Sequence, residues 1–460
     1  MFKRKKRTKV HFVGVGGIGM SGIAEVLVNL GYFVSGSDIA RGASVVRLEK
    51  MGCDVKIGHH QDHISGADVV VYSSAIPSSN PEFEAAKKSG VPLIQRAEML
   101  SELMRLKYGI AVAGTHGKTT TTSFLATILH ECNVDPTHII GGVVENLGGH
   151  AKVGKGDFIV AEADESDGTF LLLSPVFSII TNIECDHMEY YCTEKRLHSS
   201  FVKFANKIPF YGKCALNIDD KGNQQILKKI KRPIVTFGLK KNKDQYDYYA
   251  TNISHLEFGS EFDLCYQGED VGRVKINLPG EHNVYNALGA LSIAHQLDLD
   301  FDQIIKGVEK CRGVGRRFDL IYTKNDFEVL DDYAHHPTEI QMTIETARKT
   351  RDKKVIVVYQ PHRFSRIENS WKDLLHSFNN ADSVYITPIY SAGEEPIIGI
   401  NSDRLVMDIN NLHPGLAQML DKAEDIGGLL TELQSESAIV LVMGAGSISR
   451  IARESVGNLQ

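Results

Sequence analysis

The sequence predicts a three-domain α/β protein in which parallel strands are covered by helices. Short apolar runs alternate with helical patterns along the 460 residues, which is the pattern of parallel sheets. Most of these runs end in a polar or glycine-rich cluster. Ligands of such sheets bind beyond the carboxyl ends of the strands, so these clusters are the first candidates for functional sites. The length of the chain also corresponds to about three domains.

The first domain is predicted at 1–107 and the third at 313–460, and both are expected to be Rossmann-like. An amphipathic segment at 22–30 and a second one at 337–349 are expected to be helices. The strand-like runs of the first domain lie at 10–13, 33–35 and 69–72. Those of the third domain lie at 328–330, 355–359, 384–387 and 439–443.

The second domain is predicted at 108–312 and is expected to be of the P-loop ATPase type. Short alternating segments from about 213 to 278 predict a small antiparallel appendage on it. Its strand-like runs lie at 109–113, 158–161 and 176–180, and its helices at 123–132 and 283–297.

Composition excludes several classes of protein. The net charge of −6 argues against nucleic acid as a partner, since phosphate binding favours a basic face. The basic start, MFKRKKRTKV, precedes a glycine-rich segment and not an apolar one, so it predicts a solvated arm and not a signal peptide. No apolar stretch is long enough to predict membrane insertion. The seven cysteines are scattered and lack a C-x-x-C pair, which favours the reducing cytoplasm.

The segment GTHGKTTTT, between a predicted strand and a predicted helix, indicates a phosphate-binding loop. Glycines let the backbone wrap a phosphate, and the helix N-terminus attracts the anion. In such loops Lys118 reaches the β- and γ-phosphates, and the hydroxyl of Thr119 binds Mg²⁺. The position where the usual motif has its first glycine is Val112. The predicted ATP contacts are Gly114, Thr115, His116, Gly117, Lys118, Thr119 and Thr120.

A second glycine motif, G-x-G-G-x-G, follows the first predicted strand. Its glycines are Gly14, Gly16, Gly17 and Gly19. Asp38 lies near the end of the next strand, as in dinucleotide-binding folds. The physical basis is a pyrophosphate on a helix N-terminus, so the motif fits NAD, a UDP-sugar or any nucleotide diphosphate. A tight structural turn is the alternative.

A group of carboxylates follows the run at 158–161. Glu162 is a natural metal ligand at a strand end, but Asp164, Glu165 and Asp167 lie close by and the spacing does not choose among them. His187 follows the next strand, and it is either a second ligand for Mg²⁺ or Mn²⁺ or a hydrogen-bonded loop residue.

Further candidates lie in PGEHNVYN, GVGRRFD and the third domain. His282, Asn283 and Asn286 open a helix, where they either cap it or recognise adenine. Arg316 and Arg317 are either solvated hinge residues or phosphate contacts. Cations at the strand ends of the third domain suit a carboxylate ligand, which arginine binds with two hydrogen bonds. The residues of that cluster are Asp331, Asp332, His335, His336, His362, Arg363 and Arg366.

Together these motifs resemble the Mur ligase family of ATP-dependent peptidoglycan amide ligases. The matching segments are GTHGKTTT, EADESDGTF, NIECDHM, PGEHNVYN, RRFD and DDYAHHPTE, which span nearly the whole chain in the expected order. Within the family, GVGGIGMSGIA, QPHRFSR and PIYSAGE resemble the member that joins L-alanine to UDP-N-acetylmuramate.

The resemblance implies domains for UDP-sugar, ATP and amino acid in that order, and it favours UDP over NAD. It implies Thr119, Glu162 and His187 as metal ligands, and Lys118, Glu162, His187 and His335 as catalytic residues. It adds His282, Asn283, Asn286 and Arg317 to the ATP site. The implied UDP-sugar contacts are Gly14, Gly16, Gly17, Ile18, Gly19, Met20, Ser21, Asp38 and Ser74. The implied amino-acid contacts are His335, His362, Arg363 and Arg366.

Three alternatives compete with this interpretation. A sister ligase that attaches a peptide to the same sugar nucleotide would share the first two domains and differ at PIYSAGE and His362. An NAD-dependent oxidoreductase would explain the first domain alone. A non-catalytic nucleotide-binding regulator would bind ATP without releasing phosphate. The sequence gives no oligomeric state.

Overall fold

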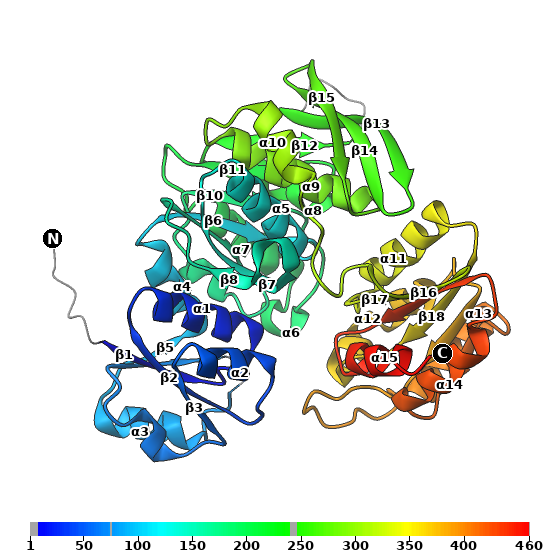
Figure 1. Ribbon diagram of the computed structural model, residues 1–460, viewed down its shortest axis with the longest axis horizontal. Coiled ribbons are helices and arrows are strands. Elements are labelled where there is room, and N and C mark those ends of the chain that lie inside the picture. Colours follow the sequence, from blue (N-terminus) through cyan, green and yellow to red (C-terminus); the bar gives the residue numbers. More distant parts are fainter. Residues whose placement is uncertain (1–7, 74–75, 240–245, 460) are drawn as a thin grey trace. The chain divides into compact units, whose positions relative to one another are not determined.

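The computed structural model describes residues 8–73, 76–239 and 246–459 (Figure 1). The chain folds into two compact units. The first comprises Met1–Ile253, Phe262–Ile276 and Val284–Arg312, and the second Ser254–Glu261, Asn277–Asn283 and Gly313–Gln460. The first unit contains the five-stranded sheet and most of the ten-stranded sheet, and the second unit contains the six-stranded sheet. The predicted α/β fold in three domains is confirmed.

The N-terminal sheet has five strands in the order β3-β2-β1-β4-β5, all parallel. Its strands are β1 (Lys9–Val13), β2 (Phe33–Asp38), β3 (Asp54–Ile57), β4 (Val69–Tyr72) and β5 (Leu93–Gln95). Its helices are α1 (Ile18–Asn29), α2 (Ala43–Lys50), α3 (Pro81–Ser89) and α4 (Arg96–Met104). Helix α1 starts at Ile18, four residues before the predicted helix, because Gly19 and Ser21 interrupt the apolar pattern in its first turn.

The central sheet has ten strands in the order β15-β14-β13-β12-β11-β10-β6-β9-β7-β8. Its strands are β6 (Tyr108–Ala113), β7 (Thr137–Val144), β8 (Gly149–Lys152), β9 (Phe158–Glu162), β10 (Phe177–Ile180), β11 (Lys213–Asn217), β12 (Ile234–Gly238), β13 (Tyr248–Leu256), β14 (Gly259–Tyr266) and β15 (Glu269–Ile276). Its helices are α5 (Lys118–Glu131), α6 (Met188–Tyr191), α7 (Glu194–Ala205), α8 (Lys221–Leu227), α9 (Glu281–His295) and α10 (Phe301–Val308).

The predicted antiparallel appendage is real but shorter than expected. Strands β11 and β12 pair in parallel with the central strands, so they belong to the main sheet. The appendage is the three-stranded meander β13-β14-β15, whose two-residue turns are possible only between antiparallel strands. The prediction placed its start at 213 because the short apolar runs of β11 and β12 look the same in sequence on either side of this boundary.

The sheet of the second unit has six strands in the order β16-β17-β21-β18-β19-β20, with only β16 antiparallel. Strand β21 is buried at every position, as expected for the centre of a sheet covered on both faces. Its strands are β16 (Asp319–Lys324), β17 (Phe327–Asp332), β18 (Lys354–Tyr359), β19 (Ser383–Ile386), β20 (Ala417–Met419) and β21 (Ala438–Met443). Its helices are α11 (Pro337–Thr350), α12 (Phe364–His376), α13 (Ser402–Leu412), α14 (Ile426–Leu433) and α15 (Ile448–Val456).

Within the described part of the chain, no helix combines the length and the hydropathy that a membrane crossing requires. None of the seven cysteines, all of which lie in described segments, forms a disulfide.

Candidate active site

The predicted phosphate loop connects the end of β6 to the start of α5. Gly114 has a φ of +133°, and a Cβ atom there would lie 2.0 Å from Oγ1 of Thr181. Gly117 has a φ of +80°, and a Cβ atom there would lie 2.3 Å from Oδ1 of Asn286. Val112 is a buried residue of β6, so the loop begins two residues later than in the usual motif. The loop therefore requires glycine at both of its glycine positions.

The segment after β10 holds this loop from one side. The Thr181 hydroxyl donates to the carbonyl oxygen of His116 at 2.6 Å, and the Asn182 side-chain amide donates to the same oxygen at 3.1 Å. The backbone N–H of His116 donates to Oδ1 of Asn182 at 2.8 Å. Sequence reasoning did not select Thr181 and Asn182, although their position directly after a predicted strand was a usable signal.

The Lys118 ammonium group lies inside the loop that contains it. Its Nζ donates to the carbonyl oxygens of Gly114 at 2.6 Å and Thr115 at 3.1 Å. It also lies 2.9 Å from a carboxylate oxygen of Glu165. Burial alone would lower the pKa of Lys118, but Glu165, Asp164 and Glu162 outweigh burial and raise it. Lys118 is therefore a fixed cation.

The structure separates the four carboxylates that the sequence left undecided. Glu162, at the end of β9, accepts the Thr119 hydroxyl at 3.1 Å and the Gly141 N–H at 2.5 Å. Glu165 pairs with Lys118, Asp164 lies 3.4 Å from Arg96, and Asp167 accepts the Thr169 N–H at 3.0 Å. A hydroxyl beside a carboxylate is an oxygen donor set that suits Mg²⁺. Thr119 and Glu162 fit the predicted metal.

His187 adopts a left-handed backbone conformation, with a φ of 55°, just before α6. Its Nε2 lies 3.4 Å from Oδ2 of Asp186. Burial raises the pKa of Glu165, and His187 is among the weaker groups that oppose this shift. His187 is thus within electrostatic range of the acidic group after β9, and its role as a metal ligand stays a prediction.

The glycine motif of the N-terminal domain leads from β1 into α1. The backbone N–H of Gly16 donates to Oδ2 of Asp38 at 2.7 Å, so Asp38 holds the loop. Ile18 is exposed, whereas Met20 and Ser21 are buried in the first turn of α1, where backbone N–H groups are the ones able to meet an anion. Ser74 lies outside the described residues.

The predicted adenine-binding residues lie in the first turns of α9. The Asn283 side-chain amide donates to the carbonyl oxygen of Pro279 at 2.7 Å, which is a structural bond. Oδ1 of Asn286 accepts the Thr121 hydroxyl at 3.2 Å and borders Gly117. Asn286 is thus placed at the phosphate loop. Burial lowers the pKa of His282 to about 4, so this imidazole is neutral at pH 7.

The second unit gathers the predicted amino-acid residues at strand ends. His335 follows β17 and His362 follows β18, with 6.4 Å between their ring centroids. Nη1 of Arg366 lies 3.2 Å from Nδ1 of His362. Tyr390 stacks on the His362 ring at 5.5 Å with an interplanar angle of 8°. Tyr390 lies within the PIYSAGE segment, but its stacking was not predicted.

Both imidazoles are neutral and their tautomers are fixed. Burial lowers the pKa values of His335 and His362 to about 4, in each case against a nearby glutamate. Nδ1 of His335 lies 3.0 Å from the carbonyl oxygen of Tyr333, so Nδ1 carries the hydrogen and Nε2 accepts. The guanidinium of Arg366 only donates, so Nδ1 of His362 accepts and its Nε2 carries the hydrogen.

The remaining charged residues of this unit are mostly paired with protein groups. Arg363 has a φ of 67°, and its Nε lies 2.9 Å from Oε1 of Glu394, a contact that the sequence did not predict. The guanidinium groups of Arg316 and Arg317 lie over the Tyr333 ring, with 4.8 and 5.2 Å to its centroid.

Asp331 accepts the Ser449 hydroxyl at 2.6 Å and pairs with Arg453 at 2.8 Å. Asp332 accepts two backbone N–H groups, from Phe318 and Ala334. Both aspartates therefore have a structural role.

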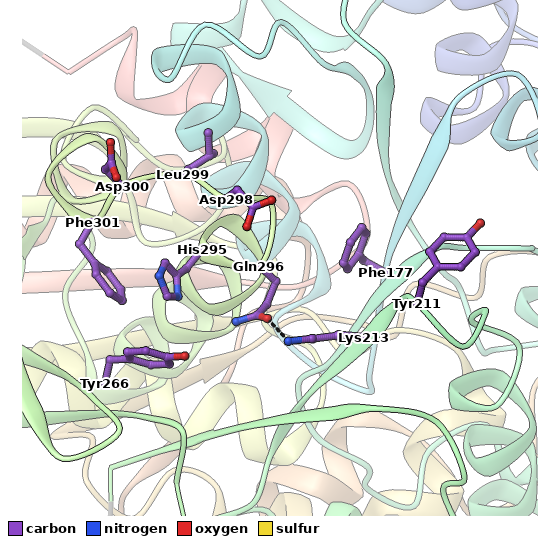
Figure 2. A pocket seen from close by; sticks show the side chains of 10 residues that line it. All are labelled: Phe177, Tyr211, Lys213, Tyr266, His295, Gln296, Asp298, Leu299, Asp300 and Phe301. Atoms are coloured by element: carbon purple, nitrogen blue, oxygen red, sulfur yellow. Dashed lines mark hydrogen bonds between the residues drawn. The ribbon is translucent and has the colours of Figure 1, made fainter.

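A cavity of about 500 Å³ lies elsewhere in the first unit (Figure 2). It lies at the amino ends of β10 and β11, whereas the phosphate loop lies at the carboxyl end of the parallel strand β6. Its Lys213 ammonium donates to the Gln296 side chain, which donates to the Tyr248 hydroxyl at 2.7 Å. Its lining is Phe177, Tyr211, Lys213, Tyr266, His295, Gln296, Asp298, Leu299, Asp300 and Phe301. This cavity is separate from the predicted site.

Replacing Gly117 by alanine is expected to weaken ATP binding at least tenfold. The new Cβ would meet both a positive φ and the Asn286 oxygen, so the loop has to move. Titration calorimetry with ATP measures the effect. Gly148→Ala is the matched control, because Gly148 has a φ of +79° and open space around it. Equal losses in the two variants would show that backbone strain alone, and not the loop, is responsible.

The stability of the second unit is expected to fall as the pH is lowered from about 6.5 toward 4. Unfolded histidines take up protons in this range, whereas the folded His335 and His362 do not. At pH 5, each of the two histidines is expected to lower the free energy of unfolding by on the order of 2 kcal/mol. Urea unfolding at pH 7.5 and pH 5 measures this loss. His335→Gln should reduce the loss and His376→Gln, which changes an exposed imidazole, should not; an unchanged loss in His335→Gln contradicts the interpretation.

Comparisons with known proteins all indicate one family. Three stretches match the Mur ligase family: 9–108 (Mur ligase family, catalytic domain), 112–294 (Mur ligase middle domain) and 316–446 (Mur ligase, glutamate ligase domain). The chain is 44% identical over 455 residues to a UDP-N-acetylmuramate--L-alanine ligase of Geotalea daltonii, covering 99% of each protein. It is 45% identical over 442 residues to the enzyme of the same name from Trichlorobacter lovleyi, covering 96% of each.

Comparison with solved structures indicates the same family. The fold is similar to that of a Thermotoga maritima UDP-N-acetylmuramate-alanine ligase, with a TM-score of 0.83, 30% identity and 98% of each chain covered. It is also similar to a murein peptide ligase of Psychrobacter arcticus, with a TM-score of 0.74, 25% identity and coverage of 98% and 99%. On this sequence and structural similarity, the chain belongs to the Mur ligase family.

Proposed function

We propose that the chain is an ATP-dependent ligase that joins L-alanine to the lactyl carboxylate of UDP-N-acetylmuramate. The observation that carries this function is the near-complete alignment with ligases of that name, at 44% and 45% identity. The geometry supports it, because one chain combines a phosphate loop with a metal-type oxygen pair and a separate cluster of arginines and neutral histidines.

The three domains divide the substrates. We assign UDP-N-acetylmuramate to 1–107, ATP to 108–312 and L-alanine to 313–460. The glycine loop before α1 suits a diphosphate, the Lys118 loop suits a triphosphate, and Arg363 and Arg366 suit a carboxylate. The absence of disulfides among the seven cysteines favours a cytoplasmic location.

The reaction needs an activated carboxylate, since a carboxylate does not react with an amine at neutral pH. In the proposed sequence, the lactyl carboxylate attacks the γ-phosphorus of ATP, the bond from this phosphorus to ADP breaks, and an acyl phosphate forms. The neutral amine of L-alanine then attacks the acyl carbon, and the C–O bond to phosphate breaks. One amine proton passes to the released phosphate or to solvent, and the amide remains. The acyl phosphate hydrolyses readily in water, so the site has to exclude water at this stage.

The residues at the phosphate loop and the predicted metal ligands each have a defined task in this scheme. Lys118 compensates the negative charge of the phosphoryl group, for which its permanent charge is suited. Thr119 and Glu162, with His187, would hold Mg²⁺ or Mn²⁺, which stabilises charge on phosphate oxygens when bound. The backbone N–H groups at the N-terminus of α5 orient the phosphates.

The second unit binds and orients the amino acid. The guanidinium groups of Arg363 and Arg366 receive the carboxylate of L-alanine. His335 presents Nε2 as an acceptor and suits an amine N–H. With a pKa of about 4, His335 is too weak a base to hold a proton at neutral pH, so it orients the amine as a neutral acceptor.

The direct test is phosphate release from ATP with Mg²⁺, UDP-N-acetylmuramate and each amino acid in turn. Release that requires both the sugar nucleotide and L-alanine supports the function. Release with a peptide but not with L-alanine would assign the chain to the sister ligases, to which the Psychrobacter arcticus protein belongs by name. ATP binding without release under any of these conditions would indicate a regulator.

Lys118→Ala is expected to lower kcat by at least about 10³-fold, because the fixed cation opposite the phosphoryl group is lost. Affinity for UDP-N-acetylmuramate, measured by calorimetry without ATP, should stay within about twofold, since that ligand binds another domain. Lys152→Ala changes an exposed lysine of the same domain and is the control. Loss of sugar-nucleotide binding in Lys118→Ala would contradict the separation of the two sites.

Arg363→Ala is expected to raise the KM for L-alanine about tenfold or more, since one charge-assisted hydrogen bond to the carboxylate is lost. The KM for ATP should not change. Arg450→Ala, in which an exposed arginine paired with Glu454 is removed from the same unit, is the control. An unchanged KM for L-alanine would remove Arg363 from the amino-acid site.

A further inference from the structure

Glu82 is a fully buried carboxylate in the first turn of α3, behind the carboxyl edge of the N-terminal sheet. Oε2 accepts Nε2 of His11 at 3.0 Å and the Ser37 hydroxyl at 2.7 Å. Oε1 accepts Nδ1 of His59 at 3.1 Å, Nδ1 of His63 at 3.1 Å and the backbone N–H of His60 at 3.3 Å. We call these six residues the Glu82 cluster. Neither the motifs nor the proposed mechanism accounts for it.

The cluster is built around an ionised carboxylate. Burial alone would raise the pKa of Glu82, but hydrogen bonds from His11, Ser37 and His63 outweigh burial and lower it to about 2. A buried carboxylate with five donors is stable only while these donors stay in place. The cluster therefore fixes the positions of the residues that donate to Glu82.

Ser37 connects the cluster to the glycine loop. Its hydroxyl donates to Glu82, and its carbonyl oxygen accepts the N–H groups of Gly14 at 2.8 Å and Val15 at 3.0 Å. The next residue, Asp38, accepts the N–H of Gly16 at 2.7 Å. Ser37 and Asp38 thus bind three successive N–H groups of the loop that leads into α1.

His59 is the second connection to this edge. The N–H of Gly58 donates to the carbonyl oxygen of Asp38 at 2.8 Å, which places His59 next to the end of β2. Because Ser37 gives its hydrogen to Glu82, both neighbours of Nδ1 of His59 are acceptors, the Ser37 hydroxyl at 3.1 Å and Glu82. Nδ1 therefore carries a hydrogen, and in the neutral form of the imidazole Nε2 is an acceptor.

We propose that Glu82 is a positioning residue for the sugar nucleotide: its carboxylate fixes the glycine loop through Ser37 and sets the tautomer of His59 at the same edge. Glu82 itself does not touch the ligand in this arrangement. The inference rests on the proposed function, because it assumes that UDP-N-acetylmuramate binds at this edge.

The first test is calorimetric titration of UDP-N-acetylmuramate into wild type and Glu82→Gln, at a temperature where circular dichroism shows both folded. We expect Kd to rise about tenfold in Glu82→Gln, the size of one lost charge-assisted hydrogen bond. In turnover assays the KM for the sugar nucleotide should rise similarly, while the KM values for ATP and L-alanine stay unchanged. Glu84→Gln, which changes an exposed carboxylate two residues further along α3, is the matched control.

The second readout is the ¹⁵N spectrum of the imidazole nitrogens. Wild type should show His59 protonated at Nδ1, and Glu82→Gln should shift His59 toward the Nε2-protonated form. A purely structural role would lower the thermal midpoint of Glu82→Gln but would leave both the Kd and the His59 tautomer unchanged. That combination would overturn the proposal.

Ser37→Ala keeps the test decisive if Glu82→Gln does not fold, since it removes a single hydroxyl from a buried strand. It should weaken sugar-nucleotide binding about threefold to tenfold, the range for loss of one hydrogen bond. Unchanged affinity in Ser37→Ala would overturn the connection from Glu82 to the loop, while the ligase function would stand. Absence of sugar-nucleotide binding in wild type would overturn both the ligase function and this proposal.

Discussion

The buried ammonium group of Lys118 is the charge on which the acidic end of the central sheet depends. Glu162 ends β9, and Asp164 and Glu165 follow it within three residues; each of these carboxylates raises the pKa of Lys118. Without a cation, carboxylates this close together would resist ionisation. The same ammonium binds two carbonyl oxygens of the phosphate loop. The charge balance of the carboxylates and the shape of the loop are therefore coupled through a single side chain.

The N-terminal domain supports its own glycine loop with a charge of opposite sign. Here the buried group is the Glu82 carboxylate, and the donors around it are imidazoles, a hydroxyl and a backbone N–H, not ammonium groups. In both domains the buried charge binds residues behind or within the loop. The common constraint is that a loop which binds phosphates needs its backbone fixed by groups other than the ligand.

The sequence predicted those parts of the site that depend on local order along the chain. The structure places at strand ends the residues that follow apolar runs, namely the Lys118 loop with Thr119, Glu162, and the histidines and arginines after β17 and β18. The sequence did not predict the side chains that these residues contact. These contacts join segments 28 to 47 residues apart, and they are Glu165 with Lys118, Tyr390 with His362 and Glu394 with Arg363. Such contacts are set by strand order, which local pattern does not contain. The predicted extent of the appendage was wrong for the same reason, because β11 and β12 differ from the meander only in how they pair with neighbouring strands.

The proposed amino-acid site of the second unit shows why burial matters as much as residue type. An amino acid brings a carboxylate, which suits guanidinium groups, and an amine, which has to be neutral to attack an acyl carbon. Charged imidazoles beside Arg363 and Arg366 would repel the ammonium form and could not accept a hydrogen bond. Burial lowers the pKa values of His335 and His362 to about 4 and so removes that charge at neutral pH. Positive charge is then confined to the arginines, and the acceptor on His335 is available to an amine. Two kinds of basic side chain thus acquire different tasks within one cluster because only the histidines can lose their charge on burial.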